Sequence, residues 1–181
     1  MNKKINQKKI SLIEYYNLSN MDLLVSNSPI NRLKHNKKLA NDVDKSTQLQ
    51  KLKKMISSIK NCELKKSANK MVFSDGNINS KIMFVGEGPG AQEDQEGLPF
   101  VGRAGKLLDK MLEAIDLNRT KVYISNVVNY RPPNNRKPTE EEIERYYPFL
   151  KLHIEIINPK ILILLGSTAL NAIVGNKEVI S

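Results

Sequence analysis

A glycine-rich run after a short apolar segment is the first place where this sequence could do chemistry. Residues 86–94 read Gly-Glu-Gly-Pro-Gly-Ala-Gln-Glu-Asp and directly follow Ile-Met-Phe-Val. Glycines allow a tight backbone path, and the exposed N–H groups of such a loop could hold an anion or a carbonyl oxygen. The run has neither the Gly-Lys-Ser/Thr of a phosphate-binding P-loop nor the spacing of a dinucleotide fingerprint. Glycine spacing alone therefore favours an ordinary structural turn.

Two later segments add side chains with binding chemistry. Residues 97–105, Gly-Leu-Pro-Phe-Val-Gly-Arg-Ala-Gly, contain an aromatic ring at Phe100. Asn126 follows a second apolar segment, and residues 131–138, Arg-Pro-Pro-Asn-Asn-Arg-Lys-Pro, combine cations with prolines. An aromatic face, an amide and nearby cations are the groups that recognise a nucleobase and its phosphates.

Three short apolar segments predict the strands that must position these residues. They are 82–85, 122–124 and 161–165, and each is followed by a loop, beginning at Gly86, Asn126 and Gly166. Continuous apolar runs of this length are typical of buried parallel strands. Loops beyond the carboxyl ends of parallel strands lie at one edge of the sheet, where α/β proteins bind ligands.

Helices are predicted between and after these strands. Residues 105–115 are expected to form a helix with Leu107, Leu108, Met111, Leu112 and Ile115 on one face. Thr139 and Glu142 have the spacing of a capping box, which predicts a helix from there to about Asn158-Pro159. A short helix is expected over 167–174. The alternation predicts an α/β fold with right-handed crossovers.

The first part of the chain reads differently. Residues 1–46 are expected to be a basic, loosely ordered extension with a short helix over 10–21, and residues 47–181 to be the folded domain. The domain would start with a helix over 47–60, in which Leu49, Leu52, Ile56 and Ile59 recur at helical spacing. No apolar run is long enough to cross a bilayer, and one cysteine excludes an internal disulfide framework. We therefore expect a cytoplasmic protein without a membrane partner.

The net charge of +10 is unevenly distributed. Residues 1–80 contain 16 Lys and Arg against 6 Asp and Glu, whereas residues 81–181 contain 13 of each. A basic arm suggests an anionic partner, most often nucleic acid. The same arm is rich in Asn and Lys, which an AT-biased coding sequence also produces, and the composition does not separate the two explanations.

Four segments together resemble the family-4 uracil-DNA glycosylases: residues 86–94, 99–108, 125–138 and 159–169. The match runs from about Cys62 to the last residue. The resemblance implies a three-layer αβα fold around a central parallel sheet. It also implies hydrolysis of the bond between uracil and deoxyribose in DNA, the first step of base-excision repair. Such enzymes turn the target base out of the stack into a pocket.

The resemblance also implies roles for individual residues. Phe100 would stack on uracil, Asn126 would hydrogen-bond its N3 and O4 edge, and Gly88 would line the pocket. Glu87, also in the first loop, is the candidate catalytic residue, with a role in orienting water. The alternatives are that Phe100 caps the core, that Asn126 serves a turn, and that Glu87 caps a helix or pairs with a cation.

The cations near the candidate pocket have a resemblance-based role as well. Arg131, Arg136 and Lys137 would contact the DNA backbone, although each could also be an ordinary surface charge. His35 and His153 lie outside every motif and are expected to be structural or exposed.

The sequence departs from the family at its metal site. The family holds a 4Fe-4S cluster with four cysteines, and the matching positions here are Ile59, Cys62, Tyr130 and Tyr146. Because isoleucine and tyrosine supply no thiolate, we expect no cluster and no other cofactor. The two tyrosines would fill the vacated space and stack on each other or on Ile59.

The second departure concerns the family's His-Pro-Ser motif, which these 181 residues do not contain. We expect a domain that is incomplete at its C-terminus, with weak or no activity alone, which is either a decaying fragment or half of a split enzyme completed by a separately encoded C-terminal part. The alternatives are a non-catalytic nucleic-acid-binding fragment and, ranked last for want of a polymerase carboxylate motif, the N-terminal piece of a phage-type DNA polymerase.

Overall fold

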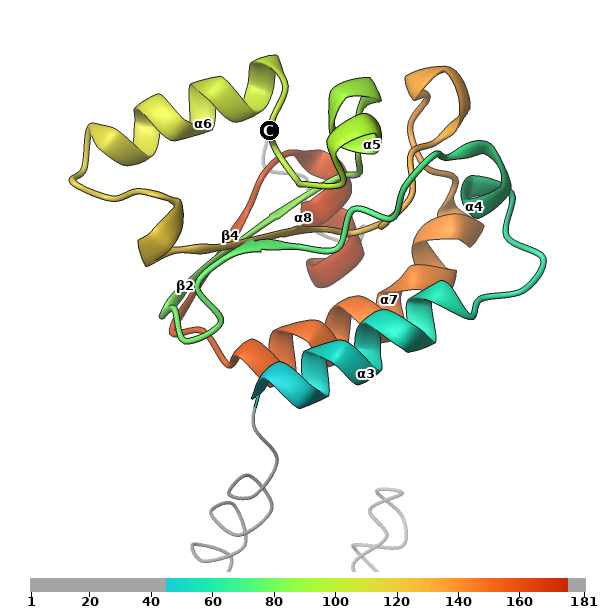
Figure 1. Cartoon of the computed structure of the whole chain (residues 1–181), viewed down its shortest axis with the longest axis horizontal. Helices are drawn as coiled ribbons and strands as arrows, with labels where there is room; N and C mark the ends of the chain where they lie inside the picture. Colours follow the sequence, from blue (N-terminus) through green and yellow to red (C-terminus); the bar gives the residue numbers. More distant parts are fainter. Residues whose placement is uncertain (1–44, 176–181) are drawn as a thin grey trace, which may run out of the picture. The chain divides into compact units, whose positions relative to one another are not determined.

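The computed structural model describes residues 45–175, which belong to one compact unit of the chain (Figure 1). The helix expected over 10–21, most of the basic extension and His35 lie outside the described residues. Among the described residues, no helix is long and apolar enough to span a membrane.

A four-stranded sheet forms the centre of the fold. Its strands are β1 (Asp75–Gly76), β2 (Ile82–Gly86), β3 (Tyr123–Asn126) and β4 (Ile161–Leu164), in the order β1-β3-β2-β4. The three predicted strands are confirmed and run parallel, with β2 between β3 and β4. The fourth, β1, was not predicted; its two residues pair antiparallel with β3 at the edge of the sheet.

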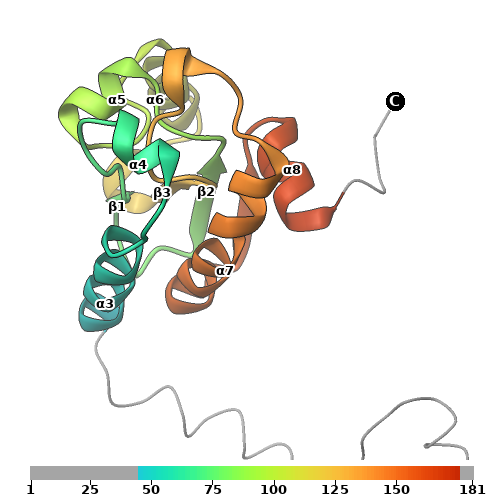
Figure 2. The same ribbon diagram turned by 90° about the vertical axis from the view of Figure 1, so that its right-hand side faces the viewer.

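Helices cover both faces of the sheet, as the three-layer expectation requires (Figure 2). On one face, α3 (Lys45–Ser57) and α7 (Glu140–Ile157) pack on Met83, Val85 and Tyr123. On the other face, α6 (Arg103–Glu113) packs on Phe84 and Ile124. Alternate residues of β2 therefore serve opposite cores, which is the period-two geometry of a strand buried on both sides.

The apolar face predicted for α6 is only partly buried. Leu108 and Leu112 pack on the sheet, but Leu107, Met111 and Ile115 are each more than half exposed, at 60%, 58% and 63%. The stripe is wider than the line of contact, because Leu108 and Leu112 alone pack with Phe84 and Ile124 of the strands, while the buried Gly105 lies against the backbone of Phe100. The predicted helix over 105–115 is thus confirmed with the bounds 103–113, and Leu108 and Leu112 are the buried residues of its apolar face.

Helix α7 begins as the sequence predicts. Thr139 Oγ1 accepts a hydrogen bond from the Glu142 N–H, and the Glu142 carboxylate accepts one from the Thr139 N–H. This capping box satisfies two backbone donors at the helix start. The helix ends before Asn158, whose φ of 50° is left-handed.

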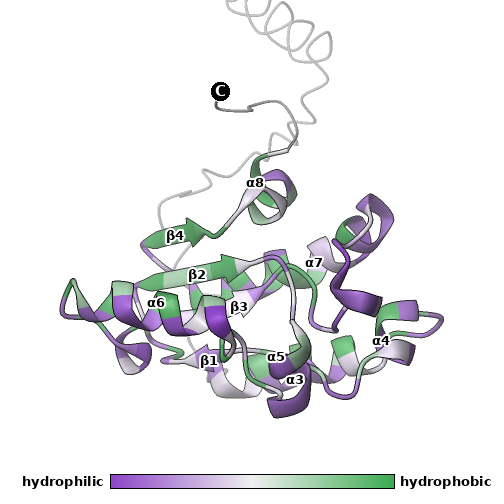
Figure 3. Ribbon diagram, turned by 90° about the horizontal axis from the view of Figure 1, so that it is seen from above, coloured by the Kyte–Doolittle hydropathy of each residue, from purple (hydrophilic) through white to green (hydrophobic). Residues whose placement is uncertain are grey.

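Short elements fill the connections between the main ones. They are α4 (Glu63–Ser67), α5 (Ala91–Glu96), the 3-10 turns η1 (Arg119–Lys121) and η2 (Pro133–Asn135), and α8 (Ser167–Val174). The helix predicted over 167–174 matches α8, and the one predicted over 47–60 matches α3 with a start two residues earlier. Viewed from above, β2 and β4 are the strongly hydrophobic strands (Figure 3).

His153 is structural, one of the two alternatives expected for it. Its side chain is 2% exposed, its Nε2 lies 2.7 Å from the Tyr123 hydroxyl, and its ring stacks on Phe73 with centroids 4.7 Å apart. Burial lowers the pKa of His153 to about 4. The ring therefore stays neutral in the core at physiological pH.

Candidate functional site

The carboxyl ends of the parallel strands meet where the candidate residues lie. Gly86, the last residue of β2, is the register partner of Asn126, the last residue of β3. Beyond them the strands stay joined, because the Val127 N–H donates to the Gly86 carbonyl at 2.8 Å. On the other side, the Leu165 N–H donates to the Val85 carbonyl at 2.8 Å, which brings the start of the third loop to the same edge.

Asn126 has an unusual environment for a buried amide. It is 3% exposed, and its side-chain Oδ1 accepts no hydrogen bond from any described residue. A buried acceptor without a partner costs about 1–3 kcal/mol, so buried polar atoms are normally paired. The turn role considered as an alternative does not account for this oxygen, because a turn would give it a backbone donor.

Phe100 reaches the same point from another part of the chain. A Cβ added to Gly86 would overlap Phe100 Cζ and would lie 2.7 Å from Asn126 Oδ1. The ring tip and the amide oxygen therefore converge on the bare backbone of Gly86. Phe100 is half-buried and also packs beside Phe84 and Leu108, so it contributes to the core as well as to this edge.

The first loop carries the candidate carboxylate. Glu87 is half-buried, and its Oε2 accepts a hydrogen bond from Thr168 Oγ1 at the start of α8. Gly88 lies against the segment after β3, where an added Cβ would be 2.7 Å from Val128 Cγ2. The structure thus joins the loops after β2, β3 and β4, and Glu87 caps no helix here.

Thr168 was missed by the sequence reasoning, although a signal existed. The loop after the third predicted strand was expected at this edge, and Thr168 is the second polar residue after Gly166. It is 8% exposed and lines a cavity of about 570 Å³ between α7 and α8, together with Lys137, Tyr147 and Asn171.

The three predicted backbone-contacting cations differ in their partners. Arg136 forms two hydrogen bonds with the Glu142 carboxylate, at 2.7 and 2.8 Å, and this contact holds the pKa of Glu142 below its usual range. Arg131 Nε donates to Asn135 Oδ1 at 2.7 Å. Lys137 is exposed and lines the cavity between α7 and α8. Of the three, Arg136 is the one already held by a carboxylate.

The four positions that match the family's cluster ligands do not fit an iron–sulfur cluster. Cys62 is buried, and its Sγ lies 3.4 Å from the Tyr146 hydroxyl. Burial raises the pKa of Tyr146 and of Tyr130, and the neighbouring thiol raises both further. All three belong to one buried cluster, against which Ile59 packs. One thiol with two phenols and an alkyl group cannot replace four thiolates.

Tyr146 also has an aromatic neighbour that was not predicted. Its ring packs edge-on against Phe149, with centroids 6.3 Å apart. Elsewhere in residues 45–175, no group of three or more His, Cys, Asp or Glu side chains could hold a metal ion.

These features define an α/β protein whose parallel strands present an aromatic ring, a buried amide and a carboxylate at one edge of the sheet. The family comparison gives this class a name. The chain belongs to the uracil DNA glycosylase superfamily, whose family model matches residues 73–180.

Individual relatives agree with the family match. The chain is 50% identical over 118 residues to the Type-4 uracil-DNA glycosylase of Thermotoga maritima, covering 65% of this chain and 62% of that protein. It is 50% identical over 119 residues to the Type-4 uracil-DNA glycosylase of Sulfurisphaera tokodaii, covering 65% and 54%. A DNA polymerase of Bacillus phage SP01 is 32% identical over 108 residues, but the match covers 12% of that protein. The chain thus spans between half and two thirds of the length of the glycosylases it matches.

Proposed function

We propose that this chain recognises uracil in DNA and hydrolyses the bond between the base and its deoxyribose. In this reaction the N1–C1′ bond breaks, hydroxide from water is added at C1′, and the base leaves with the electron pair and takes up a proton. The names of the relatives and the side chains at the strand ends both support this reaction class.

The unpartnered oxygen of Asn126 is the observation that carries the proposal. Uracil has an N–H at N3, which would donate to Asn126 Oδ1, while the amide N–H₂ would donate to uracil O4. Cytosine has an acceptor at N3, so the same site would leave two buried acceptors facing each other. A buried oxygen with no partner in residues 45–175 is therefore what a site awaiting this donor would contain.

Phe100 would supply the stacking face. A base turned out of the helix loses its stacking on its neighbours and regains part of it on an aromatic ring, a contact of about 1–3 kcal/mol. The ring meets the Asn126 oxygen at Gly86, so one base could touch both. Gly88 would line the same pocket with backbone, because its lack of a side chain lets the first loop lie against Val128.

Glu87 would orient the attacking water. Its carboxylate accepts from Thr168 on one oxygen, which fixes the direction of the other. A carboxylate held in this way could accept a hydrogen bond from water and present the water's oxygen to C1′. Thr168 enters the proposal as the residue that positions Glu87.

The DNA backbone would lie over the loop at 131–138. Of the three cations in this loop, Lys137 and Arg131 have no carboxylate partner among the described residues. Arg136 forms an ion pair with Glu142 at the start of α7. Phosphate contacts fix the register of a protein on DNA and make binding sensitive to salt.

The proposed enzyme works without an iron–sulfur cluster. The supporting observation is the buried contact of Cys62 with Tyr146, which occupies the matching positions with packed side chains. We also propose a cytoplasmic location, because the single cysteine matches a reducing compartment.

Turnover by these 181 residues alone is expected to be slow. In the family, the histidine of the His-Pro-Ser motif hydrogen-bonds uracil O2 as negative charge develops, and these residues contain no such motif. Loss of one such donor costs about 10²–10³ in rate.

The direct test uses oligonucleotides with one deoxyuridine, in single- and double-stranded form, followed by alkaline cleavage of abasic sites. Strand cleavage at the deoxyuridine, absent from matched thymidine and cytidine oligonucleotides and abolished in Asn126→Ala, supports the proposal. Equal binding to all three oligonucleotides without base release points instead to a non-catalytic nucleic-acid-binding protein. The excess of Lys and Arg in residues 1–80 is the observation that favours that second candidate.

A further inference from the structure

Phe100 occupies a backbone conformation that must be held by its surroundings. Its φ is 56°, in the left-handed region that residues with a large side chain rarely adopt. Nevertheless its ring must stay at Gly86 to meet Asn126. Contacts from other parts of the fold must therefore keep the peptide units on either side of Phe100 in place.

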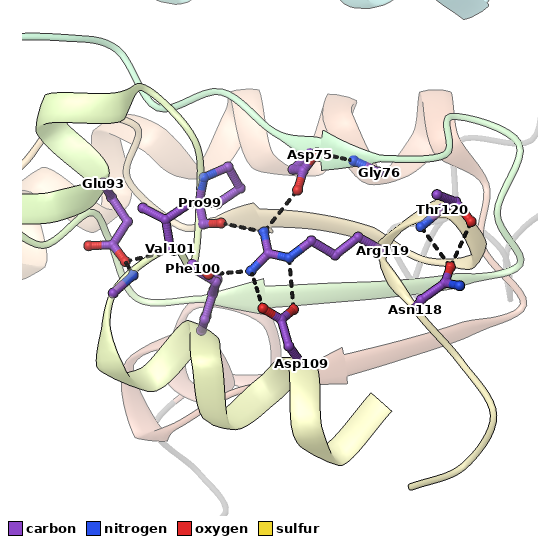
Figure 4. A network of polar contacts seen from close by, with 11 residues as sticks. Asp75, Gly76, Glu93, Pro99, Phe100, Val101, Asp109, Asn118, Arg119 and Thr120 are labelled. Carbon is purple, nitrogen blue, oxygen red and sulfur yellow. Dashed lines mark hydrogen bonds and ion pairs between the residues drawn. The ribbon is translucent and has the colours of Figure 1, made fainter. Parts of the chain in front are cut away.

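Arg119 holds the carbonyl groups of this turn. Its guanidinium donates to the Pro99 carbonyl at 3.0 Å and to the Phe100 carbonyl (Figure 4). Arg119 belongs to η1, just before β3, and is separated from Phe100 by the whole of α6. The contact is therefore tertiary and links the turn to the central sheet.

Two carboxylates orient the guanidinium. Asp75 in β1 accepts from Arg119 Nη1 at 2.8 Å, and Asp109 in α6 accepts from Nε at 2.8 Å. Burial alone would lower the pKa of Arg119, but the hydrogen bonds to Asp109 and Asp75 raise it. The arginine side chain is 24% exposed and makes contacts on three sides, so its position is well defined.

Glu93 holds the amide groups that follow. Its Oε1 accepts from the Val101 N–H at 3.0 Å and from the Gly102 N–H at 2.7 Å, as the close view of Figure 4 also shows for Val101. Its Oε2 accepts from the Gly90 N–H at 3.1 Å in the first loop. One carboxylate therefore joins the loop after β2 to the turn that carries Phe100.

Helix α6 closes the remaining side. A Cβ on Gly105 would overlap the Phe100 carbonyl oxygen and lie 2.8 Å from Phe100 Cα. The first turn of α6 thus lies directly on the backbone of Phe100. Carbonyl groups, amide groups and the Cα of this turn each have a fixed neighbour.

From these contacts we infer that Arg119, oriented by Asp75 and Asp109, is a positioning residue that sets the place of the Phe100 ring beside Asn126. Glu93 acts with it from the opposite side of the turn. The inference rests on the proposed function, since a fixed ring serves base stacking. The position of the Phe100 ring itself can be measured without any ligand.

The test compares Arg119→Gln with Arg119→Lys, because lysine keeps the positive charge whereas glutamine does not. The structural readout is the proton–proton nuclear Overhauser effect between the Phe100 ring and Gly86 Hα. The functional readout is fluorescence anisotropy with oligonucleotides that contain one deoxyuridine or one thymidine. We expect Arg119→Gln to lose the ring contact and about tenfold in preference for deoxyuridine, and Arg119→Lys to recover part of both.

Two controls separate positioning from a general loss of stability. Thr120→Ala changes the next residue of η1, whose hydroxyl donates to Asn118, and should leave ring and preference unchanged. Tyr146→Phe removes the hydroxyl that contacts Cys62 Sγ in the other core cluster and should also leave the ring contact and the preference unchanged. Asp109→Asn removes one of the two carboxylates that orient Arg119 and should give an intermediate effect. It takes the place of Arg119→Gln in the comparison if that variant does not fold.

The outcomes distinguish the two proposals. If wild-type protein does not prefer deoxyuridine, the proposed function fails while the ring contact still reports on Arg119. If Arg119→Gln and Asp109→Asn fold and keep both the ring contact and the preference, the positioning role is overturned.

Discussion

Gly86 and Asn126 face each other across two parallel strands, and the amide oxygen of Asn126 lies 2.7 Å from where any other residue at 86 would place its Cβ. The absence of a side chain at 86 therefore lets the Asn126 amide lie directly against the backbone of this strand pair. Phe100 uses the same space from the other direction. The candidate base-recognition site depends on this meeting point.

Replacing Gly86 with alanine should disrupt that point. The added methyl group would overlap the Phe100 ring and push the Asn126 amide aside, at a cost of about 1–3 kcal/mol in unfolding free energy for overpacking. We expect preference for deoxyuridine over thymidine to fall at least tenfold in anisotropy titrations. Unchanged preference in a folded Gly86→Ala protein would contradict the geometry described above.

Asn126 and Asn129 offer a matched pair of buried amides, each 3% exposed. Asn129 Nδ2 donates to the Val72 carbonyl at 3.0 Å, whereas Asn126 Oδ1 has no partner among residues 45–175. Asn129→Ala should lower the free energy of unfolding by about 1–3 kcal/mol because it leaves that carbonyl unpaired. Asn126→Ala should cost less stability yet abolish base discrimination, as measured by urea unfolding and by anisotropy. A larger stability loss at Asn126 would make it a structural residue.

Iron content tests the proposed loss of the cluster. Protein purified without oxygen from cells supplied with iron and sulfide should be colourless, because Cys62 is the only thiolate ligand available at the four matching positions. Iron analysis and the absorption spectrum near 400 nm are the measurements, with about one absorbing cluster per chain as the contrary result.

His153 should make the fold sensitive to acid. The unfolded chain protonates this imidazole near pH 6.5, but burial lowers its folded pKa to about 4, so the unfolded state binds more protons between these values. Stability should therefore fall as the pH drops from about 6.5 to about 4, by up to about 3 kcal/mol from this residue. His153→Gln keeps a hydrogen-bonding group without the titration, and its unfolding free energy should fall less steeply over the same pH range. Parallel curves would show that other groups cause the acid sensitivity.

Salt dependence should separate the cations of the 131–138 loop. Lys137→Ala should reduce the slope of log affinity for single-stranded DNA against log salt concentration by about one unit. Arg136→Ala should leave that slope nearly unchanged and lower the melting temperature instead, because Arg136 holds Glu142 at the capped start of α7. If both variants reduced the salt-dependence slope equally, both side chains would contact DNA phosphates.

The sequence predicted the parts of this fold that depend on local pattern. Apolar runs at 82–85 and 161–165, and the capping box of Thr139 and Glu142, are confirmed because strand burial and helix starts are set by nearby residues. The exposure of Met111 was not predicted, since periodicity shows an apolar stripe but not the width of the surface that covers it. Strand β1 was not predicted, because two residues are too few to show a hydrophobic periodicity.

The site shows the same division. Phe100 and Asn126 were named from motifs, and the structure brings them together at Gly86. Arg119 and Glu93 could not be identified, because their role arises from contacts with backbone groups that are brought near only by the folding of α6 and β3. Nearly every residue type has the same backbone carbonyl and N–H groups, so the sequence does not show which of them a side chain will bind.

Cys62 is buried in contact with Tyr146, so the rate at which its thiol reacts with a reagent reports how often this part of the core opens. With one thiol in the whole chain, every alkylation event reports on the same spot, and no engineered cysteine is required. A maleimide can react only after α7 has moved away from the segment before α4, so the rate of labelling measures how often this half of the core opens. Labelling of Cys62 would thus measure local opening of the native state at this position.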